Sequence, residues 1–334
     1  MTARFRTLAW VVGIGLFVSY AYFYQAGGWN QNSRFALDRA ILERHTLQID
    51  AYRLHTNDIA VWDGHYYSDK APGASLLALA PVAVARLVAR AVGVVPETFP
   101  GIAWTSYVAT VATSGVFTML AALSVLWLCL QWGYSPGAAV FAATAYAVAT
   151  PAWCFATLFI GHGLTAGCLM LAFAAAMGLN QDGLVRRNQL AWAVGLAGGW
   201  AVVSEFPAAV PVGFITALAW LNARDAHRAP LVPVLARIVI GGGLAALVLM
   251  GYHYAAFGSP FHLGYASEQG FEQLHEGFFG ITVPRWWRMR EILLGRYRGL
   301  LPLAPLIALT PIGLAVLAVS PVRRRAAIVA GATA

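Results

Sequence analysis

Acidic side chains gather in two polar segments of the sequence. Of the fourteen Asp and Glu residues, six lie within residues 25–72 and four within residues 257–298. Carboxylates are among the groups that deprotonate a hydroxyl in general base catalysis. Because the rest of the chain holds few ionisable groups, chemistry is expected in these two segments.

Arg34 and Asp38 form the first charged set. They are four residues apart in a predicted amphipathic helix, residues 32–44, and therefore share one face of it. The pattern is typical of a surface ion pair. In the alternative interpretation Arg34 binds substrate and Asp38 is a catalytic base.

Asp69 and Lys70 form the second set. Lys70 is the only lysine among 22 Lys and Arg residues, and the pair lies between the turn signals Asp63-Gly64 and Pro72-Gly73. The pattern indicates either a charged start to the next helix or a rigid pair that faces a phosphate or a sugar hydroxyl. In the second case Asp69 is a candidate base, and Lys70 and nearby His65 are candidates for binding substrate.

The second polar segment ends in arginines and aromatic residues. Five arginines and three aromatic residues lie within residues 285–298. Such a run is typical of an interfacial helix with snorkelling arginines. It also suits an anion site, because guanidinium groups match phosphate geometry. The candidate phosphate ligands are Arg285, Arg288, Arg296 and Arg298.

Two ionisable residues, His162 and Glu205, lie in or beside apolar runs. A single histidine in a membrane helix commonly hydrogen-bonds to a neighbouring helix. A carboxylate is costly to bury, so Glu205 is expected at the interface or bonded to another helix.

The composition predicts an integral membrane protein. The chain is 59% hydrophobic and 11% charged, whereas soluble domains carry about 25% charged residues. The net charge of +8 is explained by arginines in cytoplasmic loops, so no nucleic-acid partner is expected. The three cysteines lie in apolar runs and indicate neither a disulfide framework nor a zinc site.

Apolar runs predict an all-α membrane protein, a polytopic helical bundle of about 8–10 transmembrane segments. Its two outer loops, 25–72 and 257–298, are expected to carry short interfacial helices. Residues 1–334 form a single polytopic domain, and an apolar run that begins near residue 326 suggests C-terminal truncation. The predicted segments are 7–24, 73–94, 104–130, 136–152, 155–178, 190–204, 206–222, 238–256 and 299–320.

Arginines between the segments predict the orientation. Those near residues 4–6, 186–187, 224–237 and 323–325 are expected in the cytoplasm, which places both polar loops outside. Five predicted segments lie between Arg6 and Arg186. If both arginines are cytoplasmic, the number of segments that cross the membrane between them must be even. Either 73–94 or 136–152 is therefore expected not to cross.

Several short motifs resemble those of the GT-C membrane glycosyltransferases, over nearly the whole chain. The motifs are Arg34-Phe35-Ala36, Asp69-Lys70-Ala71-Pro72, Phe257-Gly258-Ser259-Pro260-Phe261 and Arg298-Gly299-Leu300-Leu301. The aminoarabinose transferase and protein O-mannosyltransferase branches are the most similar, together with bacterial glycosyltransferase-like membrane proteins. Those branches carry an acidic pair where this chain has Gln31-Asn32. The departure implies that Asp38 or Asp69 has taken the role of the base, or that the chain is not an active transferase of that kind.

The resemblance implies sugar transfer from a polyprenyl-phosphate donor to a lipid or glycan acceptor, on the outer face of a bacterial inner membrane. Membrane lipid is the other expected partner. No cofactor is evident. A divalent metal is compatible with the sequence, although no ligand set for it is evident. The alternatives are a transporter or lipid flippase, whose polar path would use His162 and Glu205, and a polytopic scaffold subunit. The concentration of charge in two loops favours the enzyme.

Overall fold

The computed structural model of the protein describes residues 3–180, 184–225, 231–270, 283 and 285–333. Six of its helices are long and apolar enough to cross a membrane, which confirms an all-α polytopic membrane protein. They are α1 (Ala3–Tyr22), α3 (Gly73–Ala91), the continuous helix Phe99–Gln131, α8 (Gly161–Gly178), Phe206–Asp225 and α11 (Leu231–Phe257).

Two of these long segments are composite. Phe99–Gln131 consists of α4 (Phe99–Thr110), a π-helical segment η2 (Val111–Gly115) and α5 (Val116–Gln131). Phe206–Asp225 begins with the 3₁₀ helix η3 (Phe206–Ala208) and continues as α10 (Ala209–Asp225).

The remaining elements are shorter or less apolar. The helices are α2 (Trp29–Arg44), η1 (Asp50–His55), α6 (Pro136–Val148), α7 (Ala152–Ala156), α9 (Leu184–Ser204), η4 (Gly264–Ser267), α12 (Trp286–Leu294), α13 (Leu300–Leu303), η6 (Pro305–Leu309), α14 (Thr310–Val319) and α15 (Pro321–Thr333). The strands are β1 (Ile59–Trp62), β2 (His65–Tyr67) and β3 (Glu268–Gln269).

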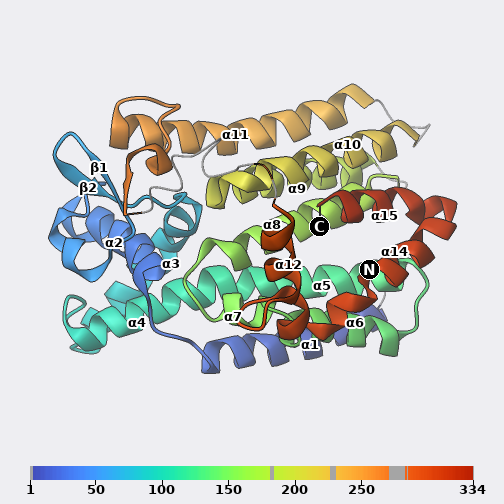
Figure 1. Cartoon of the computed structure of the whole chain (residues 1–334), viewed down its shortest axis with the longest axis horizontal. Helices are drawn as coiled ribbons and strands as arrows, with labels where there is room; N and C mark the ends of the chain where they lie inside the picture. Colours follow the sequence, from blue (N-terminus) through green and yellow to red (C-terminus); the bar gives the residue numbers. More distant parts are fainter. Residues whose placement is uncertain (1–2, 181–183, 226–230, 271–282, 284, 334) are drawn as a thin grey trace.

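One end of the bundle holds Arg187, Arg323 and Arg325. Arg187 donates to the carbonyl of Ala223, Arg325 pairs with Asp225, and Arg323 donates to the carbonyl of Trp132. These contacts bring four distant segments together at what we call the arginine end. Figure 1 shows α2 and the strands at the opposite end, which we call the loop end.

Helix α3 does not run from one end of the bundle to the other, although it is long and apolar enough to do so. Arg86, in its last two turns, pairs with Glu43 of α2 and with Glu97 just before α4. Trp104 of α4 donates to the carbonyl of Ala85. Both ends of α3 therefore lie at the loop end, where Figure 1 also shows the start of α4.

This placement accounts for the odd number of segments predicted between Arg6 and Arg186. Without α3, four described segments are left as candidates to run between the two ends of the bundle: α1, α4–α5, α6–α7 and α8. Helix α6 spans only about 20 Å, but Tyr20, near the end of α1, donates to the carbonyl of Ala147. Residues 136–157 thus reach the loop end, where Gln25 bonds to Thr157.

Helices α9 and α11 pack closely through small residues. A Cβ atom on Gly195 would lie 3.0 Å from the Cα atom of Ile238, and one on Gly241 would lie 3.0 Å from the amide nitrogen of Leu196. Small residues let backbones approach each other in membranes, where dispersion contacts replace the hydrophobic effect between helices. Larger side chains here would push the two helices apart.

The two polar loops are joined by a small antiparallel sheet of order β2-β1-β3. Asp63 and Gly64 connect β1 and β2 with φ angles of 49° and 80°, as a type I′ hairpin turn requires. Strand β3 comes from the second loop and pairs Glu268 with Ala60. The turn was predicted from the sequence, but the pairing between loops was not.

Candidate functional site

Lys70 is held between two carboxylates. Its Nζ atom lies 2.6 Å from Oδ2 of Asp69 and 2.9 Å from Oδ2 of Asp58. Burial lowers the pKa of Lys70, but the two carboxylates outweigh it and raise that pKa above its ordinary value. Burial raises the pKa of Asp69 despite the opposing charge of Lys70. The ammonium group is thus kept charged in a largely enclosed position.

Arg34 connects the first loop to the start of η3. Its guanidinium donates to Oε1 of Glu205 at 2.8 Å, to the carbonyl of Ala71 at 2.8 Å and to Oδ1 of Asn30 at 3.1 Å. A buried guanidinium needs such partners, because desolvation of the charge is otherwise costly. Arg34 and Asp38 do share a helix, but the carboxylate that Arg34 binds is Glu205.

Glu205 also contacts the start of α8. Its Oε1 atom lies 3.4 Å from Nδ1 of His162, and a Cβ atom on Gly161 would collide with the carboxylate. Burial raises the pKa of Glu205, but the bond to His162 and the charges of Arg34 and Lys70 hold it below its ordinary value. The carboxylate also lies at a helix N-terminus, where negative charge is favoured.

Close backbone contacts fix these groups in place. A Cβ atom on Gly73 would lie 2.7 Å from the backbone nitrogen of Ser204, so the start of α3 meets the end of α9. A Cβ atom on Gly264, in the second loop, would lie 3.0 Å from the carbonyl oxygen of Asp69. Glycine is needed at both positions because a side chain would separate the segments that carry the charges.

The charged cluster is partly accessible. Asp69 is fully buried, whereas 12% of the Lys70 side chain, 14% of Glu205 and 48% of His162 are exposed. The groups that can meet a ligand are therefore the histidine, the glutamate and the lysine. The charged cluster consists of Arg34, Asp58, Asp69, Lys70, His162 and Glu205.

Asp38 lies outside this cluster. Its side chain is wholly buried, and neither carboxylate oxygen has a hydrogen-bond partner among the described residues. Burial raises its pKa well above the ordinary value, and the charge of Arg34 opposes this only in part. Burial favours the protonated form of this carboxyl group and keeps it out of reach of a substrate, which argues against its predicted role as a base.

His65 is also separate from the cluster. It lies in β2 beside the hairpin turn and is exposed, with its Nδ1 atom 2.7 Å from Oδ2 of Asp50. The same carboxylate accepts the backbone N–H of Tyr66. These contacts give His65 a local structural role.

The arginine segment 285–298 is not brought to the cluster. The side chains of Arg285, Arg288, Arg296 and Arg298 are all exposed. Arg288 lies over the ring of Trp287 and Arg298 over that of Tyr297, as in an interfacial segment. Figure 1 shows α12 over the middle of the bundle and well apart from α2. Glu272 and Glu276, two of the four acidic residues of the second polar segment, lie outside the described residues.

Gln31 and Asn32, which occupy the position of the acidic pair, both have structural roles. The side chain of Gln31 accepts the backbone N–H of Gly28 at the start of α2. Asn32 donates to the carbonyl of His55 and so ties η1 to α2. In the part of the chain that the structure describes, neither side chain forms a hydrogen bond to the charged cluster.

Three members of the cluster, Asp58, Glu205 and His162, are not among the site residues predicted from the sequence. The sequence predicts that His162 bonds to a neighbouring helix and that Glu205 lies at the interface or bonds to another helix, and both side chains do form such contacts. The one available signal was the cost of a carboxylate beside an apolar run, which demands a partner. Among the described residues, no group of three or more His, Cys, Asp or Glu side chains is arranged to hold a metal ion.

An apolar groove begins one helical turn from the cluster. Leu77 follows Gly73 by four residues and Trp200 precedes Ser204 by four, and both line a cavity of about 310 Å³. Leu244 and Val248 of α11 form its outer wall and are partly exposed. One end of the groove therefore lies about one helical turn from the point where the start of α3 meets the end of α9.

Comparison of the chain with protein-family models, with curated proteins and with solved structures found no match.

Proposed function

We propose that this integral membrane protein is a glycosyltransferase that moves a sugar from a polyprenyl-phosphate donor to a hydroxyl acceptor. The observation that carries the proposal is the charged cluster at the loop end, above an apolar groove. A lipid-linked substrate needs both features, because its chain stays in the bilayer while its phosphate and sugar lie at the headgroup level. We place the loop end on the outer face of a bacterial inner membrane, from the arginine distribution.

Lys70 is the proposed phosphate ligand. An ammonium group has three N–H donors, and Asp58 and Asp69 account for two of them. Among the described residues no further acceptor for the ammonium group of Lys70 is found, so the third donor can bind a phosphate oxygen. Asp69 positions Lys70 and does not contact the substrate in the proposed reaction, because its side chain is fully buried.

His162 is the proposed general base, oriented by Glu205. Its imidazole takes the proton of the acceptor hydroxyl while the acceptor oxygen bonds to the anomeric carbon of the sugar. The bond from that carbon to the phosphate oxygen breaks, and polyprenyl phosphate leaves as an anion beside Lys70.

A transporter would need polar groups distributed along the spans. Its two candidate residues, His162 and Glu205, both belong to the charged cluster at the loop end. Buried hydroxyls of the described spans, such as those of Thr113 and Thr118, bond to carbonyls of their own helix. These observations favour the enzyme over the transporter.

The test is release of polyprenyl phosphate from a panel of short-chain polyprenyl-phosphate hexoses and pentoses. Purified protein in nanodiscs would be supplied with membrane lipid and glycan extracts as acceptors. His162→Ala and Glu205→Gln should lower release by about 10²–10⁴-fold. His55→Ala and Asp63→Asn are matched controls, because both side chains are exposed and Asn tolerates a positive φ.

Absence of release from every donor by the parent protein would refute the transferase. Release that His162→Ala and Glu205→Gln leave unchanged, in proteins that remain folded, would refute the assignment of the base.

A further inference from the structure

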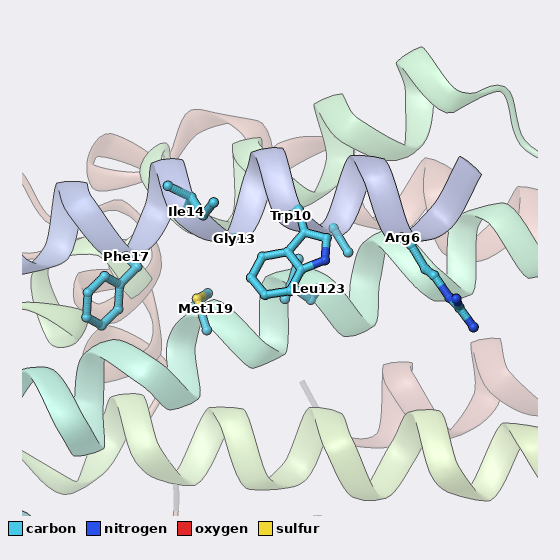
Figure 2. A pocket seen from close by; sticks show the side chains of 8 residues that line it. Arg6, Trp10, Gly13, Ile14, Phe17, Met119 and Leu123 are labelled. Carbon is cyan, nitrogen blue, oxygen red and sulfur yellow. The ribbon is translucent and has the colours of Figure 1, made fainter. Parts of the chain in front are cut away.

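A second groove runs along one face of α1, where α1 lies against α5. Figure 2 shows Arg6 at one end of it and Phe17 at the other, with Met119 and Leu123 of α5 between them. Its volume is about 520 Å³, within the range of about 300–1,000 Å³ that is usual for small-molecule sites. The α1 residues follow a spacing of three and four and so share one face: Arg6, Ala9, Trp10, Gly13, Ile14 and Phe17.

The groove opens toward lipid. Trp10 is 71% exposed and Ile14 57% exposed, on a helix that is apolar enough to cross the membrane. Gly13 forms the floor, because a side chain there would reach Leu123 and Met119 of α5. The occupant must therefore be apolar along nearly the whole groove.

The length and the one charge of the groove indicate a lipid. Arg6 and Phe17 are eleven residues apart, or about 16 Å along the helix, which matches half of a hydrocarbon core of about 30 Å. The groove thus extends over one leaflet. Arg6 lies at the end of the groove nearest the membrane surface, at the headgroup level. No ion-pair partner of Arg6 is found among the described residues.

We propose that this groove binds one anionic glycerophospholipid from the surrounding bilayer. One acyl chain lies between Gly13, Met119 and Leu123, and the phosphate contacts the guanidinium of Arg6. The bound lipid fills the space between α1 and α5 and stabilises the folded protein by mass action. The site lies toward the start of α1, away from the charged cluster, so it is independent of the proposed transferase activity.

The experiment is native mass spectrometry of the full chain in mild detergent, titrated with phosphatidylglycerol or with phosphatidylcholine of the same acyl chains. The parent should bind one phosphatidylglycerol molecule about tenfold more tightly than phosphatidylcholine, as one charge-assisted bond permits. Arg6→Gln should abolish that preference. Gly13→Leu should remove one bound lipid of either kind, because its side chain occupies the groove.

Two matched variants complete the design. Gly15→Leu adds the same side chain where no atom lies within 4 Å, and Arg186→Gln removes an exposed arginine elsewhere. Both should bind lipid like the parent. Parent-like binding by Arg6→Gln, or equal affinity of the parent for the two lipids, would overturn the proposal. Arg6 is exposed, so its variant remains informative even if Gly13→Leu does not fold.

Discussion

Arg34 and Glu205 lie 171 positions apart in the sequence, and their side chains form an ion pair with an N–O distance of 2.8 Å. The pair connects the first polar loop to the junction between α9 and η3. Only 1% of the Arg34 side chain is exposed. Arg34 also donates to the carbonyl of Ala71, so it joins Glu205 to the segment that carries Lys70.

Removal of one partner from this pair should strongly destabilise the protein. Glu205→Leu leaves the buried guanidinium of Arg34 without its carboxylate, and we expect a loss of about 3–5 kcal/mol in the free energy of unfolding. Asp225→Leu breaks the exposed pair with Arg325 and should cost less than about 1 kcal/mol. Chemical unfolding in detergent would compare the two, and equal losses would contradict the prediction.

Asp38 should make the stability depend on pH. Its pKa is raised in the folded state, whereas the unfolded chain releases this proton near pH 4. The contribution of Asp38 to the free energy of unfolding is therefore fully present below the pKa of the unfolded chain. It is lost as the pH rises toward the pKa of the folded state. Asp38→Asn has no proton to lose, so its unfolding free energy relative to the parent should increase from pH 4 to pH 8. A difference that is constant with pH would show that Asp38 is not buried in its neutral form.

The placement of α3 predicts which residues share a side of the membrane. In a variant without the three native cysteines, single cysteines at Leu54 and Val92 should react with the same membrane-impermeant maleimide in intact cells. Both positions are exposed, at 95% and 70%. A cysteine at Arg186 should react only after permeabilisation. Opposite accessibility of positions 54 and 92 would mean that α3 crosses the membrane.

The close approach of α3 to α9 should be sensitive to a single methyl group. Gly73→Ala places a Cβ atom 2.7 Å from the backbone of Ser204 and should cost about 1–3 kcal/mol. It should also weaken binding of a short-chain polyprenyl phosphate, because Lys70 moves with the start of α3. Gly213→Ala meets no atom within 4 Å and is the control, expected to match the parent in both measurements.

Composition and local pattern were sufficient for the secondary structure and the class of protein. The low charge content predicted a helical membrane protein, and the dipeptides Asp63-Gly64 and Pro72-Gly73 predicted a turn and a helix start that the structure contains. The helix expected at 32–44 extends over Trp29–Arg44. These features depend on the backbone preferences and hydrophobicity of neighbouring residues, which the sequence records directly.

Partners across the fold were decided by tertiary structure alone. Arg34 has an acidic residue one turn away at Asp38, yet it binds Glu205, because α2 packs against α3, and the start of α3 meets the end of α9 beside Glu205. Local spacing also could not show that α3 turns back, that the two loops share a sheet or that the arginines of 285–298 lie apart from Lys70. Each of these features depends on which buried charges and backbone segments come into contact when the helices pack. The spacing of residues along the sequence does not determine those contacts.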